Sequence, residues 1–249
     1  MKFFDAHAHL PTPDSVGLEA FLRFTETQPD LVGANLILNT TAEAEFVLDH
    51  LDSLPSSVVL VPYFDPESRH PEALRSAGWY KLHPTLQRLD AAEIPAVVAA
   101  LRAEEPRGVI VHAFPWGPEL RFNVSLPLVI ALAEAMPATT ILVAHGGGYE
   151  SWQFRAHVGA LENVHFEFSV TLDYYAGTDS VAVLARYLTY SPRRMHFGSD
   201  WPSGDIQRQM VELLRLATDA GLEEDGLEAL LLRNAEACWP TAFTGRSGA

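Results

Sequence analysis

The stretch from Val164 to Val170, VHFEFSV, alternates apolar and polar side chains along its whole length. Alternation with a period of two predicts a β-strand whose apolar residues share one face, while His165, Glu167 and Ser169 share the other. A strand covered by apolar layers on both faces would not carry polar side chains in this way. In a barrel, the apolar face packs against surrounding helices and the polar face lines the interior. The stretch therefore predicts a barrel strand.

Short β-rich runs followed by helical patterns recur on both sides of this stretch. The predicted strands cover Lys2–Ala6, Ala34–Asn39, Val58–Tyr63, Gly78–Leu82, Gly108–Val111, Thr140–Ala144, Val164–Ser169 and Met195–Gly198. The predicted helices include Leu18–Thr27, Ala42–Leu54, Ala91–Glu104, Leu126–Met136, Ser180–Tyr190 and Ile206–Ala220, and Leu227–Ala237 follows as an extra C-terminal helix.

Strands that alternate with helices predict a parallel sheet, because parallel neighbours need long crossover connections. The chain has 249 residues, and a (β/α)8 TIM barrel needs roughly 250. A doubly wound open sheet is the alternative, but it would need a glycine-rich phosphate-binding turn after the first strand. The chain has His7-Ala8-His9 there instead. We therefore expect an α/β fold, a single-domain (β/α)8 TIM barrel over residues 1–249.

Charge and composition restrict the classes of partner. Seventeen Lys and Arg against 32 Asp and Glu give a net charge of −15, which repels nucleic-acid phosphates and anionic membranes. The longest apolar run, Leu126–Ala133, is too short to span a bilayer, and Asp5 interrupts the N-terminal apolar run too early for a signal peptide. The single cysteine, Cys238, fits a reducing compartment. We expect a cytoplasmic protein with a small-molecule substrate, and a homodimer is left open.

Five ionisable residues at predicted strand ends indicate a metal centre. His7 and His9 are two residues apart, so their imidazoles project from one face with a Cβ separation of about 6 to 7 Å. His112, His145 and Asp200 end three other predicted strands. The carboxyl ends of barrel strands meet at one rim, and mixed nitrogen and oxygen donors suit zinc, with iron, manganese or cobalt as alternatives.

Further residues are predicted to contact the substrate. Lys81 and His83 share the inward face of the fourth strand, and Arg121 follows the fifth. The glycines at 146–148 lack the Lys-Ser/Thr of a phosphate-binding loop, and we expect them to let the backbone approach the centre. Aromatic residues after the fifth to eighth strands are candidates for an apolar pocket suited to a cyclic or aromatic substrate: Trp116, Trp152, Tyr174, Tyr175 and Trp201.

These motifs occur in a known order. Asp5-Ala-His7-Ala-His9, the strand-end His112 and His145, Gly198-Ser-Asp200-Trp-Pro and Arg233-Asn234-Ala235 resemble the amidohydrolase superfamily, and within it the amidohydrolase-2 branch of metal-dependent hydrolases and decarboxylases. The resemblance implies that His7, His9, His112 and Asp200 bind the metal. It implies that His145 lies beside the catalytic water, or binds a second metal ion.

The number of metal ions depends on Lys81. Two-metal members often use a carboxylated lysine at the end of the fourth strand, where this chain has Lys81. The pattern Lys81-Leu-His83-Pro also resembles one-metal members with a free lysine. We expect one divalent ion, zinc by preference.

The predicted chemistry is hydrolysis of an amide, ester or lactone. A bound divalent ion lowers the pKa of water to about 7, Asp200 accepts the proton and passes it to the leaving group, and His145 stabilises the developing charge. The alternative is a non-oxidative decarboxylase, in which Arg121 would anchor the substrate carboxylate. A third reading is a barrel that binds metal or ligand without turnover, although it would not need Asp200 and His145 beside the ligands.

Overall fold

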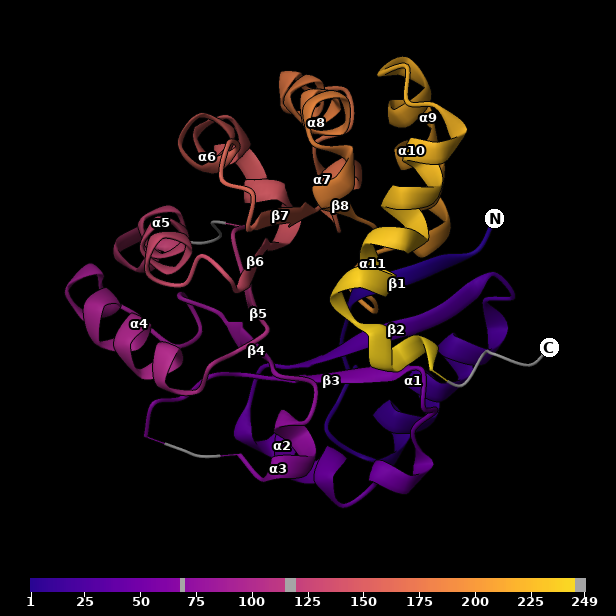
Figure 1. Cartoon of the computed structure of the whole chain (residues 1–249). Helices are drawn as coiled ribbons and strands as arrows, with labels where there is room; N and C mark the ends of the chain where they lie inside the picture. The colour runs from indigo at the N-terminus through magenta and orange to yellow at the C-terminus, as the bar shows by residue number, and fades with distance from the viewer. Residues whose placement is uncertain (68–69, 115–119, 245–249) are drawn as a thin grey trace.

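Parallel strands surround a common axis, and helices lie outside them, in the computed structural model of the chain (Figure 1). The structure describes residues 1–67, 70–114 and 120–244. The strands are β1 (Phe3–Ala8), β2 (Leu31–Leu38), β3 (Val58–Pro62), β4 (Trp79–Leu82), β5 (Gly108–Val111), β6 (Thr140–Val143), β7 (Val164–Glu167) and β8 (Met195–His196). The (β/α)8 TIM-barrel prediction is confirmed.

The helices are α1 (Ser15–Thr27), α2 (Thr41–Leu48), α3 (Glu72–Arg75), α4 (Ile94–Ala103), α5 (Ser125–Ala135), α6 (Ser151–Val158), α7 (Thr171–Tyr174), α8 (Asp179–Tyr190), α9 (Ile206–Asp219), α10 (Glu224–Glu228) and α11 (Asn234–Cys238). Side-chain caps set several of their starts: Asp14 accepts from the backbone nitrogen of Gly17 in α1, and Asp205 accepts from that of Arg208 in α9. The sequence patterns did not indicate α3, α6 or α7. The predicted C-terminal helix is present as α10 and α11, joined by a π-helical turn over Ala229–Arg233.

The hydrogen-bond ladders form two sheets, β1–β2–β3 and β4–β5–β6–β7–β8. At the first seam, Tyr63 bridges to Lys81 and the backbone nitrogen of Phe64 donates to the carbonyl of Lys81. At the second seam, Ala8 bridges to Trp201. Isolated bridges therefore replace ladders at two places, because Pro62 at the end of β3 has no N–H to donate and β8 is only two residues long.

The side chain of Asn234 links the terminal helices to the strands. Its side-chain amide donates to the carbonyls of Pro192 and Met195. Trp239, directly after α11, stacks on Phe4 of β1 and lies against Trp79 of β4. The C-terminal segment thus covers the barrel near the N-terminal ends of β1 and β4.

Within the described residues, no helix has both the length and the apolar character that crossing a membrane requires.

Candidate metal centre at the carboxyl ends of the strands

Three donor atoms converge where β1 ends and where the chain leaves β8. Nε2 of His7 lies 3.1 Å from Nε2 of His9 and 3.4 Å from Oδ1 of Asp200, and Nε2 of His9 lies 3.2 Å from the same oxygen. Ligands about 2.1 Å from a tetrahedrally bound ion are about 3.4 Å from one another. The spacing of these three atoms therefore fits one transition-metal ion.

The opposite ring nitrogens explain why both Nε2 atoms can act as ligands. Nδ1 of His7 lies 2.7 Å from Oε1 of Glu167, and Nδ1 of His9 lies 3.0 Å from the carbonyl oxygen of Ile37. Both partners accept hydrogen bonds and favour the proton on Nδ1, although the amide nitrogen of Asn39 also lies 3.3 Å from Nδ1 of His9. With the proton on Nδ1, both Nε2 lone pairs face the gap between the rings. A cation there removes the repulsion between the lone pairs.

Asp200 supplies a carboxylate to this gap. Its backbone has a φ of 56°, a conformation uncommon outside glycine. Its nitrogen donates to the carbonyl of His7 at 2.7 Å, which fixes the loop to β1. Burial favours the protonated acid, but the contact with His9 and the other nearby imidazoles outweighs it, and the pKa of Asp200 lies below its usual value. Asp200 therefore presents an ionised carboxylate to this gap.

Lys81 lies on β4, and His83 follows that strand. Lys81 is buried on β4 with Nζ 3.4 Å from Nε2 of His7, and burial lowers its pKa to about 8. The ring of His83 stacks on that of His112 at 3.7 Å. Lys81 thus lies beside the three-donor group, whereas His83 contacts it only through other imidazoles.

His112 and His145 form a pair of their own. Nδ1 of His112 lies 3.1 Å from Nε2 of His145. Nε2 of His112 faces the carbonyl of Phe114, and Nδ1 of His145 faces the carbonyl of Ser169. Since both carbonyls require a proton on the facing nitrogen, the contact between the two rings needs a further shared proton or a cation. The donor atoms of His7, His9 and Asp200 lie together. His112 contacts this group only indirectly, through His145, whose ring centroid is 4.9 Å from that of His7.

A left-handed turn brings His145 into the interior. His145, Gly146, Gly147 and Gly148 have φ values of 60°, 57°, 87° and 56°. A Cβ on Gly147 would lie 2.5 Å from the Phe154 ring, and one on Gly146 would lie 2.8 Å from Phe168. These glycines allow the positive φ of the turn that places His145, and close packing on aromatic rings. Whether they also let the backbone approach a bound ion stays a prediction.

Glu167 is the residue that the sequence reading did not assign to the site. It is fully buried on β7. Besides His7, its carboxylate accepts from the backbone nitrogen of His145 at 2.9 Å and from the backbone and hydroxyl of Ser169. The inward-facing alternation of β7 was the signal that could have found it. A metal-binding histidine commonly donates its other N–H to such a carboxylate.

Asp5 lies beneath the same ligands. It is buried and accepts from the backbone of His7 and from the backbone and hydroxyl of Ser199. Burial raises its pKa to about 7, although these hydrogen bonds act in the opposite direction. Asp5 therefore positions the backbone of β1 and of the segment before Asp200.

The aromatic residues divide into two groups. Phe114 packs edge-on against His145 and contacts Tyr174 and Tyr175, which makes an aromatic wall beside the centre. Trp201 instead stacks on Phe24 of α1 at 4.7 Å. The Trp152 ring is exposed on α6, with the Arg155 guanidinium over it.

Arg121 and Trp116 are the two remaining residues that the sequence predicted as substrate contacts. Arg121 is exposed, and its guanidinium lies over the Phe122 ring at 4.4 Å. Trp116 lies outside the described residues.

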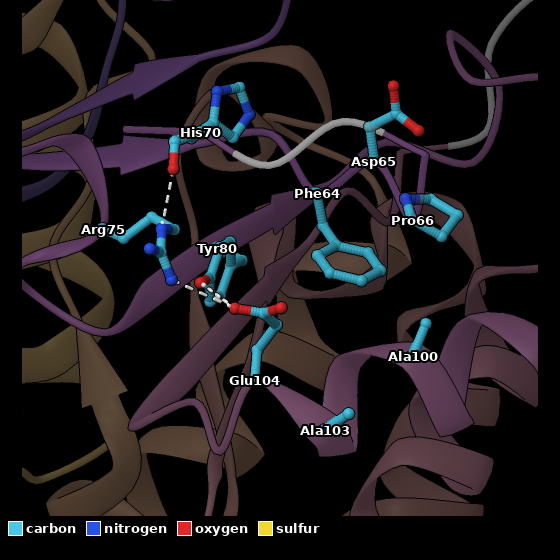
Figure 2. A pocket seen from close by; sticks show the side chains of 9 residues that line it. All are labelled: Phe64, Asp65, Pro66, His70, Arg75, Tyr80, Ala100, Ala103 and Glu104. Atoms are coloured by element: carbon cyan, nitrogen blue, oxygen red, sulfur yellow. Dashed lines mark hydrogen bonds and ion pairs between the residues drawn. The ribbon is translucent and has the colours of Figure 1, made fainter. Parts of the chain in front are cut away.

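A separate cavity of about 200 Å³ opens beside β4, on the face away from Lys81 (Figure 2). Arg75 there donates to the carbonyl of His70 and pairs with Glu104, and Tyr80 donates to the same carboxylate. Arg75 and Glu104, two of the charged groups that line it, are thus paired with each other, and the residues of the candidate metal centre do not line it.

The chain is similar to known proteins in sequence and in fold. A sequence model described as amidohydrolase matches residues 58–241. An uncharacterized TIM-barrel protein from Bordetella bronchiseptica is 14% identical, with a TM-score of 0.71 over 98% of this chain and 100% of that one. A dihydroorotase from Campylobacter jejuni is 16% identical, with a TM-score of 0.61 over 96% of this chain and 83% of that one. A TatD homolog from Escherichia coli is 14% identical, with a TM-score of 0.57 over 96% and 98%. No curated protein matches significantly.

Proposed function

Because this chain belongs to the amidohydrolase family, we propose that it is a metal-dependent hydrolase that cleaves an amide, ester or lactone bond of a small molecule. The convergence of Nε2 of His7, Nε2 of His9 and Oδ1 of Asp200 carries the proposal. No other feature of the centre requires a cation so directly, because two imidazole lone pairs and a carboxylate share one gap.

The proposed ligands are His7, His9 and Asp200, with His112 as the fourth. The donor atoms of the first three residues lie close to one another, whereas His112 contacts this group through His145. Nitrogen and oxygen donors of this kind suit zinc. A divalent ion held there would supply Lewis acidity and lower the pKa of water to about 7.

Asp200 and His145 are the proposed catalytic residues. The carboxylate of Asp200 is ionised and partly exposed, so it can accept a proton from water and return it to the leaving group. His145 is fixed through Nδ1 by the carbonyl and hydroxyl of Ser169, so its Nε2 carries the lone pair and can accept a hydrogen bond from the attacking water. Lys81 and His83 are proposed substrate contacts.

The aromatic wall of Phe114, Tyr174 and Tyr175 supports a cyclic or aromatic substrate. The decarboxylase alternative needs a cation to anchor a substrate carboxylate. The Arg121 guanidinium is exposed and lies over the Phe122 ring, so this alternative gains no support from the contacts of Arg121 that the structure describes.

The test is a substrate panel on zinc-loaded protein, with one arm of amides, esters and lactones and another arm of aromatic carboxylic acids. We expect turnover in the first arm and no carbon dioxide release in the second. Carbon dioxide release without hydrolysis would replace the proposal with the lyase, and stoichiometric metal without turnover on either arm would favour a binding protein.

Metal content tests the number of ions. We propose one ion in this centre with Lys81 as a free amine, and elemental analysis after loading with and without bicarbonate should give the same value. An additional ion per chain that requires bicarbonate would indicate a carboxylated Lys81 and a second ion between His112 and His145.

A further inference from the structure

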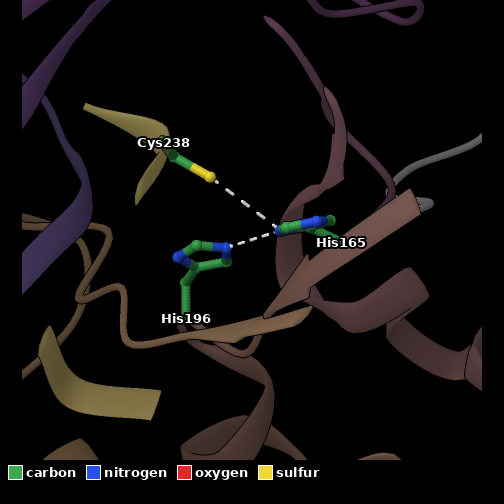
Figure 3. A group of neighbouring side chains, drawn as sticks. All are labelled: His165, His196 and Cys238. Atoms are coloured by element: carbon green, nitrogen blue, oxygen red, sulfur yellow. Dashed lines mark hydrogen bonds between the residues drawn. The ribbon is translucent and has the colours of Figure 1, made fainter. Parts of the chain in front are cut away.

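A second group of metal-type donors lies deeper in the barrel than the centre described above. It consists of His165 on β7, His196 on β8 and Cys238 at the end of α11 (Figure 3). His165 precedes Glu167 by two residues on the same inward-facing side of β7, so the group lies on the N-terminal side of Glu167. None of these residues belongs to the proposed catalytic centre.

The three donor atoms face one another. Nδ1 of His165 lies 2.9 Å from Nε2 of His196, and Sγ of Cys238 lies 4.0 Å from the same Nδ1. All three lie within 4.8 Å of one another. Bond lengths of about 2.1 Å to nitrogen and 2.3 Å to sulfur place tetrahedral ligands about 3.4 to 3.6 Å apart. The two separations that involve Nδ1 of His165 are therefore within about half an ångström of those in a bound site, and Sγ lies within 4.8 Å of Nε2 of His196.

The surroundings favour the neutral form of the two imidazoles that metal binding requires. Burial, with the nearby Arg194, lowers the pKa of His165 to about 4, and burial also places the pKa of His196 well below its usual value. Both rings are thus neutral. Nδ1 of His196 has no hydrogen-bond partner among the described residues, so no second acceptor or donor fixes its tautomer.

Cys238 decides the kind of ion. Burial raises the pKa of its thiol to about 12, so the thiol stays protonated until a metal displaces the proton, and Arg107 opposes part of this shift. A donor set of two imidazoles and one thiolate selects borderline or soft ions, and it disfavours magnesium and calcium. The catalytic centre has no sulfur donor, because Cys238 is the only cysteine in the chain.

We propose that His165, His196 and Cys238 form a second, structural site for a thiophilic transition-metal ion such as Zn²⁺, which ties the C-terminal helix α11 to β7 and β8. The site is independent of the catalytic proposal, since it shares no ligand with it. An ion there would reinforce the hydrogen bonds that Asn234 already makes from the same helix to Pro192 and Met195.

Cobalt substitution tests the site directly. Full-length protein is stripped with chelator, desalted without thiol reductants in the buffer, and titrated with Co²⁺. A cobalt–thiolate bond gives a near-ultraviolet charge-transfer absorption that nitrogen and oxygen ligands do not give, so any such band reports Cys238 alone. We expect the band in the wild-type protein and its loss in Cys238→Ser, with hydrolytic activity retained. We also expect at least tenfold weaker cobalt binding, read from the band, in His165→Gln.

A matched variant separates the two sites. His9→Ala combined with Asp200→Asn disables the catalytic centre, and we expect it to keep the charge-transfer band. Bound Zn²⁺ should also slow the reaction of Cys238 with a thiol reagent in this variant. The proposal is overturned if cobalt-saturated wild-type protein shows no band, if thiol reactivity is the same with and without Zn²⁺, or if His165→Gln binds with unchanged affinity.

Discussion

Oε1 of Glu167 lies 2.7 Å from Nδ1 of His7, and both side chains are fully buried. The same oxygen accepts from the backbone nitrogen of His145 at 2.9 Å. One carboxylate on β7 therefore sets the ring of a proposed ligand on β1 and the backbone of a proposed catalytic residue after β6. It also keeps the proton on Nδ1 of His7, which leaves Nε2 free to bind metal.

Glu167→Gln tests this relationship. The amide oxygen can still accept from His7, but it lacks the charge that raises the basicity of the ring. We expect metal affinity to fall about 10- to 100-fold, measured by competition with a chelator. Glu212→Gln, at a half-buried position on α9 that pairs with Arg215, is the matched control and should bind metal like the wild type. Unchanged affinity in Glu167→Gln would mean that Glu167 is only a packing residue.

Asp200→Asn should remove turnover and only part of the metal. The amide can still offer an oxygen ligand, but it cannot accept a proton, so kcat should fall about 10²- to 10⁴-fold. Steady-state kinetics and elemental analysis on the same preparation check this, with Asp219→Asn as a control on the exposed end of α9. Equal kcat in Asp200→Asn and wild type would remove Asp200 from the proposed mechanism.

The variants His112→Ala and His145→Ala distinguish a metal ligand from a residue that contacts the catalytic water. If His112 is the fourth ligand, its removal should weaken metal binding at least about tenfold, whereas His145→Ala should keep the metal and lose activity. Isothermal titration with Zn²⁺ into stripped protein gives both affinities. Should His112→Ala bind Zn²⁺ like the wild type, the ion is held by His7, His9 and Asp200, and His112 acts only through His145.

Gly147→Ala tests the left-handed turn. A side chain at positive φ costs about 1 to 2 kcal/mol, and at Gly147 the new Cβ would also collide with Phe154. Gly177 has a φ of 78° and open space around it, so Gly177→Ala carries the backbone strain alone. Urea unfolding should show the larger loss of stability for Gly147→Ala, together with reduced kcat because His145 shifts. Equal losses of stability in the two variants would show that the Phe154 ring moves aside at no cost in free energy.

Trp201 illustrates how far a sequence position can mislead. It directly follows Asp200, which predicted a place at the barrel mouth, yet its ring stacks on Phe24 of α1. Sequence proximity fixes where the backbone of Trp201 lies, but not which way its ring points. The apolar surface of α1 offers that ring more burial than the polar centre does.

The sequence by itself determined the barrel and the position of each predicted ligand along its strand. Alternation such as that of Val164–Val170 reports which side chains face inward. His7, His9, His112 and His145 lie at or within two residues of the end of a strand, and Asp200 follows β8 by four residues. These signals are local, because they depend on a period of two and on the order of elements. They therefore survive without coordinates.

Only the tertiary structure decided which of these residues touch. The pairing of His112 with His145, the carboxylate of Glu167 under His7, and the approach of Cys238 to His165 join residues far apart in the chain. Such contacts depend on strand register, on the left-handed turn at His145 and on the path of α11 back across the barrel. A periodic pattern carries no information about these distances, because it repeats along one element while the contacts form between elements.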